Sequence, residues 1–401
     1  MSLKESVLLK GATLIGFADR NVCGKSLDVA IGADGRVAAT GNLVQEDWDN
    51  VFDVQSCYLS PGWIDLHTHV YKVGRAGLDP TLIGPLYGVA GLVDAGSAGE
   101  ATFAGLKEYV VDPADFPIRV FLNIGSFGSV SYEHESIDLS KTSERVEQNR
   151  DVIRGIKVLA SKRYIKGCWI HPVVAAKRLA FDLDLPLMVH VAEPPVYLEE
   201  LVNDILGSGD IITHCFHGKV GNSVRSSPSR VIALYRQAVE KGILLDVAHG
   251  AASFSFESAR VAIEQGVKPA TISTDLHQGN INGPVWSLAT VMSKMLACGL
   301  DLQEVVEMVA INPATILGEV SHGSLEPGAK ASFTVFDVKK GDFTFSDSGA
   351  RDDYTSGSDI SSQNMFPGDV FVRPQHTCLG NSVIKARAYG LKQNLNSVAG
   401  K

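Results

Sequence analysis

Short apolar runs alternate with amphipathic segments through most of the chain. The strand-like runs cover residues 62–67, 90–95, 117–124, 155–160, 186–192, 210–215, 242–247 and 269–275. Segments 229–242 and 255–266 show apolar residues at helical spacing, and a glycine ends each of them. Eight strands that alternate with helices predict an α/β fold, a (β/α)8 TIM barrel over residues 61–319. A doubly wound sheet is the alternative, but no Gly-x-Gly-x-x-Gly follows the first run.

The two ends of the chain show a different pattern. Residues 7–57 read as short strands separated by glycine turns, without a helical period. Similar strand patterns return at 331–338 and 382–389, so we predict that 1–60 and 320–401 form one small β-sandwich domain. Residues 341–364 are rich in Ser, Asp and Gly, which predicts a surface loop.

Composition narrows the class of protein. Of the 401 residues, 45% are hydrophobic, which is enough for a large buried core. The net charge of -9, from 36 basic and 45 acidic residues, argues against nucleic acid as a partner. No uncharged apolar stretch reaches about 18 residues, so we predict no membrane-spanning helix.

The cysteines indicate the compartment. Six are scattered without a Cys-x-x-Cys motif, as is typical of free thiols in a reducing environment. Charged residues interrupt the N-terminal apolar run, so we expect no signal peptide. The sequence therefore predicts a cytoplasmic protein.

Residues with metal-binding chemistry recur at the ends of the predicted strands. His67 and His69 follow the first run, and alternation along a strand points both the same way, together with Asp65. Later strand ends carry further candidates: Lys157, His190, His214 and Asp275. A single such histidine is more often structural. Five coincidences on one rim are improbable, because charged residues are rarely buried unless they are paired or bound to metal. The pattern therefore predicts a metal centre.

These motifs resemble those of the amidohydrolase superfamily. The sequence Pro-Gly-Trp-Ile-Asp-Leu-His-Thr-His at 61–69, followed in order by Lys157, His190, His214 and Ser-Thr-Asp at 273–275, is similar to its motif set. The stretch 323–336 resembles the family's return to its small β domain. The sequences around His190 and His249 look closest to the amidohydrolase/deacetylase, or dihydroorotase-like, branch.

The resemblance implies a binuclear site. Two divalent metal ions, usually zinc, would be held by six side chains: His67, His69, Lys157, His190, His214 and Asp275. His67, His69 and Asp275 would hold one ion, and His190 and His214 the other.

The resemblance also implies a role for the remaining ligand. Lys157 would be carbamylated by carbon dioxide and would bridge the ions together with a hydroxide. The hydroxide would attack the scissile carbonyl, and Asp275 would take its proton and pass it to the leaving group.

Substrate contacts are predicted less directly. His249 follows the seventh strand and is a candidate for orienting substrate, while Tyr71 and Arg75 lie on the loop after the first strand. Dihydroorotases of this superfamily carry His-x-His-x-Arg, and Tyr71 stands at the arginine position. The roles of other polar residues on these loops stay open: His217, Lys72 and His134. Cys215 is adjacent to His214 and is expected to face away from the barrel axis.

We therefore expect a metal-dependent hydrolase that cleaves an amide or ester bond, acetyl being the favoured acyl group, of a small polar metabolite. The alternative is a cyclic amide hydrolase of the dihydroorotase or hydantoinase kind. A third hypothesis is a non-catalytic scaffold on the same fold. We expect no nucleic-acid or membrane partner and allow for a homo-oligomer. Trp286 and the helix at 286–298 are candidates to face another subunit.

Overall fold

The computed structural model describes residues 5–72, 77–129, 132, 136–348 and 364–394. Its central feature is a parallel, curled sheet with the strand order β12-β11-β10-β9-β8-β7-β6. The strands are β6 (Trp63–Thr68), β7 (Val89–Ala95), β8 (Ile118–Asn123), β9 (Ile153–Leu159), β10 (Leu187–His190), β11 (Ile211–Thr213) and β12 (Leu244–Asp246). Each coincides with a predicted run. Most are buried on both faces, which suits parallel strands covered by helices.

The eighth predicted strand closes the sheet through isolated bridges. Thr271 pairs with Asp246 of β12, and Leu276 pairs with Thr68 of β6. The backbone N–H of Asp275 also donates to the carbonyl of His67 at 2.7 Å. The sheet is therefore a closed barrel, and the predicted fold class is confirmed.

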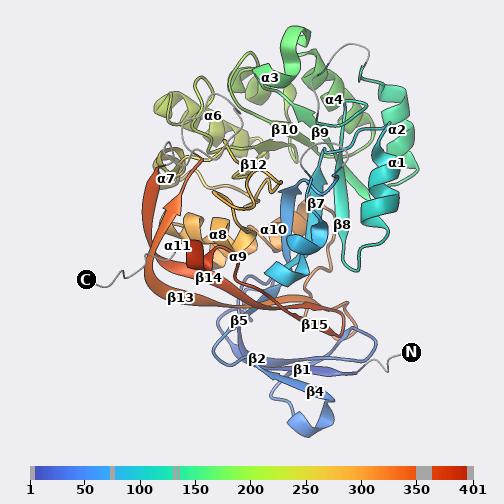
Figure 1. The fold of residues 1–401 in the computed structure, drawn as a ribbon, viewed down its shortest axis with the longest axis vertical. Coiled ribbons are helices and arrows are strands. Elements are labelled where there is room, and N and C mark those ends of the chain that lie inside the picture. The colour runs from blue at the N-terminus through green and yellow to red at the C-terminus, as the bar shows by residue number, and fades with distance from the viewer. Residues whose placement is uncertain (1–4, 73–76, 130–131, 133–135, 349–363, 395–401) are drawn as a thin grey trace.

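Helices surround the barrel (Figure 1). The α-helices are α1 (Phe103–Leu106), α2 (Leu139–Glu147), α3 (Lys162–Ile165), α4 (His171–Asp182), α5 (Leu198–Glu200), α6 (Pro228–Glu240), α7 (Phe256–Glu264), α8 (Leu288–Ala297), α9 (Leu302–Glu307), α10 (Ile311–Ile316) and α11 (Leu391–Asn394). Helices α6 and α7 correspond to the two amphipathic segments of the sequence. The side chain of Ser255 caps α7 by accepting the N–H of Ser258.

Short helical turns complete the connections. The 3-10 turns are η1 (Gln45–Asp47), η2 (Pro80–Leu82), η3 (Pro85–Tyr87) and η6 (Lys166–Cys168), and the π-helical turns are η4 (Lys107–Val111) and η7 (Leu201–Ile205).

A second sheet combines both ends of the chain, as predicted. Its strand order is β15-β14-β13-β5-β1-β2-β3, and β4 also pairs with β1. The strands are β1 (Val7–Leu14), β2 (Ser26–Ile31), β3 (Val37–Gly41), β4 (Asn50–Asp53), β5 (Tyr58–Pro61), β13 (Ser332–Ser346), β14 (Met365–Leu379) and β15 (Ser382–Lys385). The domain boundaries at residues 60 and 320 stay a prediction.

Two long strands of this sheet extend beyond it along the barrel. In Figure 1, β13 and β14 rise from the lower sheet along the barrel side toward α7. Because β13 continues to Ser346, the predicted loop at 341–364 is wrong over its first part, and 349–363 lie outside the described residues. The physical reason is burial: Phe343 and Phe345 pack with Phe371 of β14 in one aromatic cluster.

Helix α8 lies beneath this ribbon of β13 and β14. Every residue from Leu288 to Met295 is buried, and the helix packs against β14. The expectation that this helix faces another subunit is therefore wrong, because the chain's own ribbon covers it.

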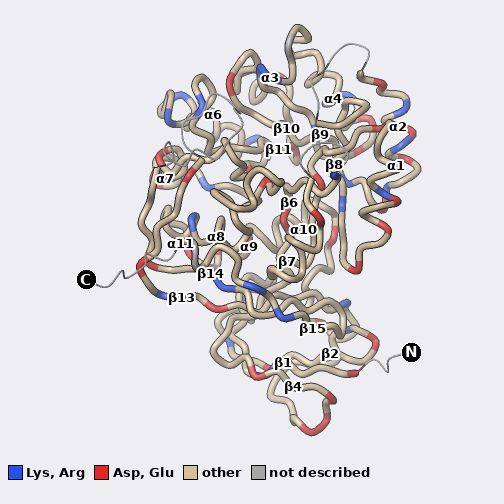
Figure 2. The backbone as a smooth tube through the Cα atoms, viewed as in Figure 1, with Lys and Arg blue, Asp and Glu red and all other residues tan. Residues whose placement is uncertain are grey.

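Charged residues of both signs are dispersed along the chain (Figure 2). Acidic residues, 45 against 36 basic ones, are spread over helices and loops in both parts of the molecule. In the described ranges, every helix is too short or too polar to cross a membrane.

Candidate metal centre

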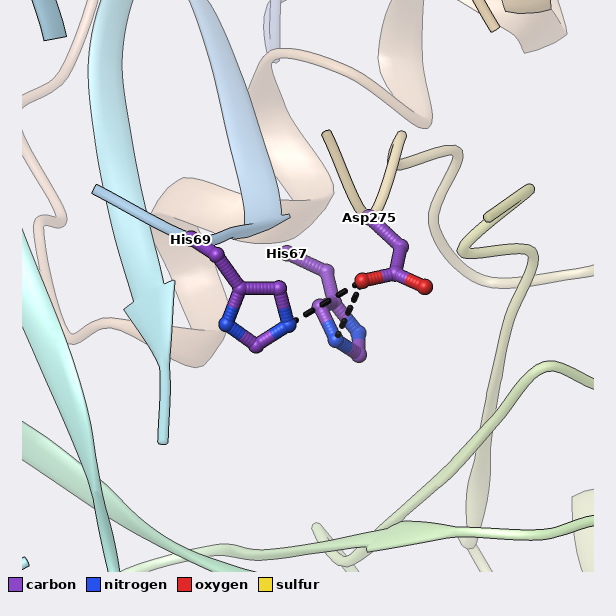
Figure 3. Close-up of side chains that lie close together, drawn as sticks. All are labelled: His67, His69 and Asp275. Carbon is purple, nitrogen blue, oxygen red and sulfur yellow. Dashed lines mark ion pairs between the residues drawn. The ribbon is translucent and has the colours of Figure 1, made fainter. Parts of the chain in front are cut away.

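The first metal-binding group forms where the barrel closes. His67 and His69, at the end of β6, meet Asp275 of the eighth segment, and their ligand atoms all lie within 4.8 Å of one another (Figure 3). The Nε2 atom of His69 lies 3.1 Å from Oδ1 of Asp275, and Nε2 of His67 lies 3.7 Å from the same oxygen. Two imidazoles and one carboxylate thus converge on one point.

Asp275 is held in a backbone conformation that few residues adopt. Its φ of 53° lies in the left-handed region, as does the φ of 67° of His214. Such conformations persist only where the surrounding structure imposes them, and they cluster at functional sites. The two strand ends therefore turn sharply at the residues that carry the candidate ligands.

The other three predicted ligands lie next to this group. Lys157 of β9 is fully buried, and its Nζ lies 3.3 Å from Nε2 of His67. Nε2 of His214 lies 2.8 Å from Nδ1 of His190, a spacing that lets both nitrogens reach one ion. The rings of His67 and His214 are 5.2 Å apart. The structure therefore brings all six predicted side chains together on one barrel rim.

Hydrogen bonds fix how His67 presents its ring. The hydroxyl of Thr213 donates to Oδ2 of Asp246 at 2.7 Å, so it accepts the Nδ1–H of His67 at 3.0 Å. Further hydroxyls, from Thr271 and Ser273, also donate to this carboxylate. The lone pair of Nε2 is thereby directed toward Asp275 and Lys157. Sequence reasoning missed Thr213 and Asp246.

The other rings are oriented in a similar way. Nδ1 of His214 donates to the carbonyl of Ala248 at 2.7 Å, and Nδ1 of His69 lies 2.7 Å from the hydroxyl of Ser97. The backbone N–H of Ser97 in turn donates to Oδ1 of Asp94 at 2.8 Å, which holds Ser97 in place. Outer partners of this kind fix the tautomer and orientation of metal-binding histidines.

Burial favours the uncharged forms of Lys157, His67 and His214. It lowers the pKa of Lys157 to about 7 and the pKa of His214 to about 3, and holds the pKa of His67 well below its usual value. Burial alone would raise the pKa of Asp275, but the hydrogen bond from His69 and the electrostatic interactions with the neighbouring histidine rings together hold it well below its usual range. Neutral imidazoles and an ionised carboxylate are the forms that bind divalent metals. The residues therefore fit a metal centre.

A small cavity of about 70 Å³ opens beside the ligands. Besides the candidate ligands, three polar residues line this cavity: Ser129, Tyr164 and His277. None of the three was predicted from the sequence. Ser129 and His277 lie on loops and Tyr164 lies in the short helix α3, and they have no spacing pattern of their own, although His277 stands two residues after Asp275. These groups can contact a bound molecule.

Two of the predicted substrate contacts, Tyr71 and His249, do not line this cavity. The Tyr71 hydroxyl packs against Gly105 of α1, so closely that a Cβ added to this glycine would lie 2.5 Å from the hydroxyl oxygen. Tyr71 therefore points away from the cavity beside His69 and does not line it. His249 is fully buried and hydrogen-bonded to the side chain of Lys294. Arg75 lies outside the described residues, as does His134.

Three further candidates can also be placed. His217 is buried, and its Nδ1 accepts the backbone N–H of Lys219. Cys215 is fully buried, and its carbonyl accepts the hydroxyl of Tyr235. Lys72 is exposed and lies 3.7 Å from Asp79. None of the three lines the cavity.

A closed α/β barrel whose strand ends gather imidazoles, an amine and a carboxylate around a cavity is an arrangement typical of metal-dependent barrel hydrolases. The sequence pattern of the amidohydrolase family matches residues 58–363, and the chain belongs to this family. It is a hydrolase, and members of the family generally use a binuclear centre of divalent metal ions.

Known proteins resemble the chain over nearly its whole length. It is 41% identical over 398 residues to a deacetylase of Agrobacterium fabrum, and this alignment covers 96% of this chain and 93% of the relative. It is 39% identical over 372 residues to a deacetylase of Brucella anthropi, with 90% of this chain and 89% of the relative covered. A crystal structure described as a dihydroorotase shares 37% identity, with a TM-score of 0.87 over 96% of this chain and 98% of that chain.

Proposed function

We propose that the protein is a metal-dependent deacetylase, which hydrolyses the acetyl amide or acetyl ester of a small polar metabolite. The observation that carries the proposal is the convergence of His67, His69 and Asp275 beside Lys157 at the mouth of the barrel. The names of the two bacterial relatives support the choice of an acetyl group.

Two ions would be held by the six side chains described above. His67, His69 and Asp275 would bind one ion, and His190 and His214 the other. Zn²⁺ is the ion that suits a donor set rich in imidazole. When bound, such ions polarise the acyl carbonyl and lower the pKa of water.

Lys157 would carry a carbamate. A neutral amine is the form that attacks carbon dioxide, and burial lowers the pKa of Lys157 to about 7. The new N–C bond forms as the nitrogen loses one proton to water, and the product is an anionic carbamate with two oxygens. The carbamate oxygens would extend beyond Nζ, which lies 3.3 Å from Nε2 of His67.

Asp275 would act as the proton carrier. Its carboxylate is ionised and has one oxygen beside His69. It can accept the proton of an attacking water and return it to the departing nitrogen or oxygen, so that the acyl bond breaks without release of an unstable anion. Tyr164 and His277 lie on the cavity wall, where they can contact the substrate.

A cyclic amide hydrolase is the second candidate, because of the dihydroorotase structure that the chain resembles. Tyr71 stands where a dihydroorotase would carry arginine, and a phenol cannot form the two parallel hydrogen bonds that guanidinium makes with a carboxylate. We therefore expect poor recognition of dihydroorotate. A cytoplasmic location and a homo-oligomeric state stay predictions.

A substrate panel tests the proposal. Zinc-supplemented protein should hydrolyse at least one N-acetylated amino acid or O-acetylated hydroxy acid, measured by acetate release, and should leave dihydroorotate intact. Asp275→Asn keeps the shape and removes the proton acceptor, so kcat should fall at least about 10²-fold. Opening of dihydroorotate with kcat/KM above about 10⁴ M⁻¹s⁻¹ would instead favour the second candidate.

A further inference from the structure

A second buried lysine lies behind the metal centre. Lys294, in the middle of α8, is 0% exposed. Its Nζ bonds to Nε2 of His249 at 2.8 Å, to the carbonyl of Pro284 at 2.7 Å and to the carbonyl of Ser346 at 2.7 Å. An ammonium has three donors, and each has an acceptor here. Lys294 thus links the segment after β12, the loop before α8 and the end of β13.

The bond from Lys294 determines the tautomer of His249. Because Nε2 accepts the proton of the ammonium, Nδ1 carries the ring hydrogen and donates to the carbonyl of Gly250 at 2.9 Å. The ring also stacks on Phe254, with centroids 4.5 Å apart and an interplanar angle of 21°. His249 is therefore fixed on both edges and on one face.

Gly250 forms a wall for the Asp275 carboxylate. A Cβ built on Gly250 would lie 2.6 Å from Oδ2 of Asp275, and the φ of Gly250 is 58°. Its N–H donates to the carbonyl of Thr274 at 2.9 Å. The glycine main chain therefore lies against Oδ2, while Oδ1 faces His69.

The end of the β13 segment secures the same glycine. The hydroxyl of Ser348 donates to the Gly250 carbonyl at 2.8 Å, and its backbone N–H donates to the carbonyl of Phe254 at 3.0 Å. A segment of the second sheet thus contacts the loop that touches Asp275.

We propose that Lys294 is a positioning residue, which fixes the orientation of the Asp275 carboxylate through His249 and Gly250 and makes this orientation depend on the docked end of β13. The proposal rests on the proposed function in one respect: it takes Asp275 as a metal ligand and proton carrier. His249 then acts behind the site, as a link between Lys294 and Gly250.

Lys294→Met tests the link, because methionine keeps an unbranched apolar stem and has no N–H donor. We expect the variant to lose Zn²⁺ to a chromophoric chelator at about tenfold lower chelator concentration, and kcat to fall about tenfold with little change in KM. Lys294→Gln retains two donors and should recover part of both losses.

Ser293→Ala is the matched control. Ser293 is the preceding residue of α8, is 0% exposed, and accepts the N–H of Val372 in β14 at 2.9 Å. Its loss weakens the contact between helix and ribbon without touching His249. The melting temperature should fall, whereas zinc retention and kcat should stay at the wild-type level.

Gly250→Ala tests the last step, because a methyl group would displace Oδ2 of Asp275. It should weaken zinc retention at least as much as Lys294→Met. Wild-type zinc retention and kcat in folded Lys294→Met, or in Gly250→Ala, would overturn the proposal. If Lys294→Met does not fold, Lys294→Gln replaces it, and wild-type values there would have the same meaning. Zinc retention needs no substrate, so a failed deacetylase assay leaves this test valid.

Discussion

Two lysines with the same burial have different surroundings in this protein. Lys157 and Lys294 are both 0% exposed, and burial lowers the pKa of each to about 7. Nζ of Lys157 lies near Nε2 of His67 and Sδ of Met188, at 3.3 and 3.2 Å. Nζ of Lys294 bonds to two carbonyls and one imidazole.

The difference shows that the partners of a buried lysine, and not its burial, indicate its role. A thioether is a weak acceptor and an imidazole provides one lone pair, so the neighbours of Lys157 are a poor environment for an ammonium. The same amine lines the cavity, where a small reactant can reach it. Lys294 has an acceptor for each of its three possible N–H donors, which favours a structural role. The predictions below test this contrast.

The largest effect is expected at Lys157. Lys157→Ala removes the proposed carbamate, so zinc should fall to one ion per chain or fewer, and kcat/KM should fall at least about 10³-fold, as expected when several kcal/mol of stabilisation by metal ions is lost. Metal analysis of purified protein and steady-state kinetics measure both. Short carboxylic acids should restore part of the activity, because their two oxygens can replace the carbamate.

Lys294→Met is the comparison for this variant, since it should keep two ions when zinc is in excess. Full activity and full zinc content in Lys157→Ala would show that Lys157, like Lys294, is not needed to hold the metal ions, and the carbamate proposal would be wrong.

A smaller effect is expected in the pH dependence of stability. Burial lowers the pKa of Lys294 to about 7 in the folded protein, whereas its ordinary value in an unfolded chain is 10.5. The unfolded state therefore binds more protons between these pH values, and the free energy of unfolding rises with pH. From pH 7 to pH 9 the contribution of one such lysine is of the order of 1–3 kcal/mol.

Urea unfolding of wild type and Lys294→Met at both pH values measures this contribution, because the difference between the proteins cancels the titration of Lys157. Three titratable groups face Lys294: His249, Cys298 and Asp347. Burial keeps His249 neutral by holding its pKa well below the usual value, and burial raises the pKa of Cys298 to about 12. His249 and Cys298 therefore do not change charge between pH 7 and pH 9. Parallel pH dependences in the two proteins would mean that Lys294 stays charged throughout.

The sequence predicts the barrel well, because its strands are set by local patterns. Each of the seven strands of the parallel sheet overlaps an apolar run, and strand ends in such barrels share one rim. The ligand candidates could therefore be placed together before any contact was known. The extension of β13 to Ser346 was missed because Ser, Asp and Gly dominate 341–364, although Phe343 and Phe345 alternate with polar residues in a strand pattern.

Contacts between distant segments could not be predicted in this way. His249 and Lys294 are 45 residues apart, and their hydrogen bond depends on how α8 docks beneath the ribbon. The lysine within the apolar helix at 288–297 was the one sequence signal of a buried contact. Apolar helices also form subunit interfaces, so the pattern did not show what this helix packs against. Ser129 reaches the cavity from a loop, and Tyr164 reaches it from the four-residue helix α3, which is too short to show a periodic pattern.

The smallest effect concerns the support of a ligand next to Lys157. Thr213 accepts the Nδ1–H of His67 and donates to Oδ2 of Asp246. Thr213→Val keeps the shape but leaves this buried N–H without a partner, so zinc affinity and kcat/KM should each fall about tenfold. Thr271→Val is the control, because its hydroxyl bonds to the other oxygen of Asp246 at 2.7 Å. It should lower the free energy of unfolding by about 1 kcal/mol and change zinc affinity little. Equal losses of zinc affinity in the two variants would show that Asp246 acts through the general stability of the barrel, whereas a loss confined to Thr213→Val shows that orientation of His67 is what the carboxylate provides.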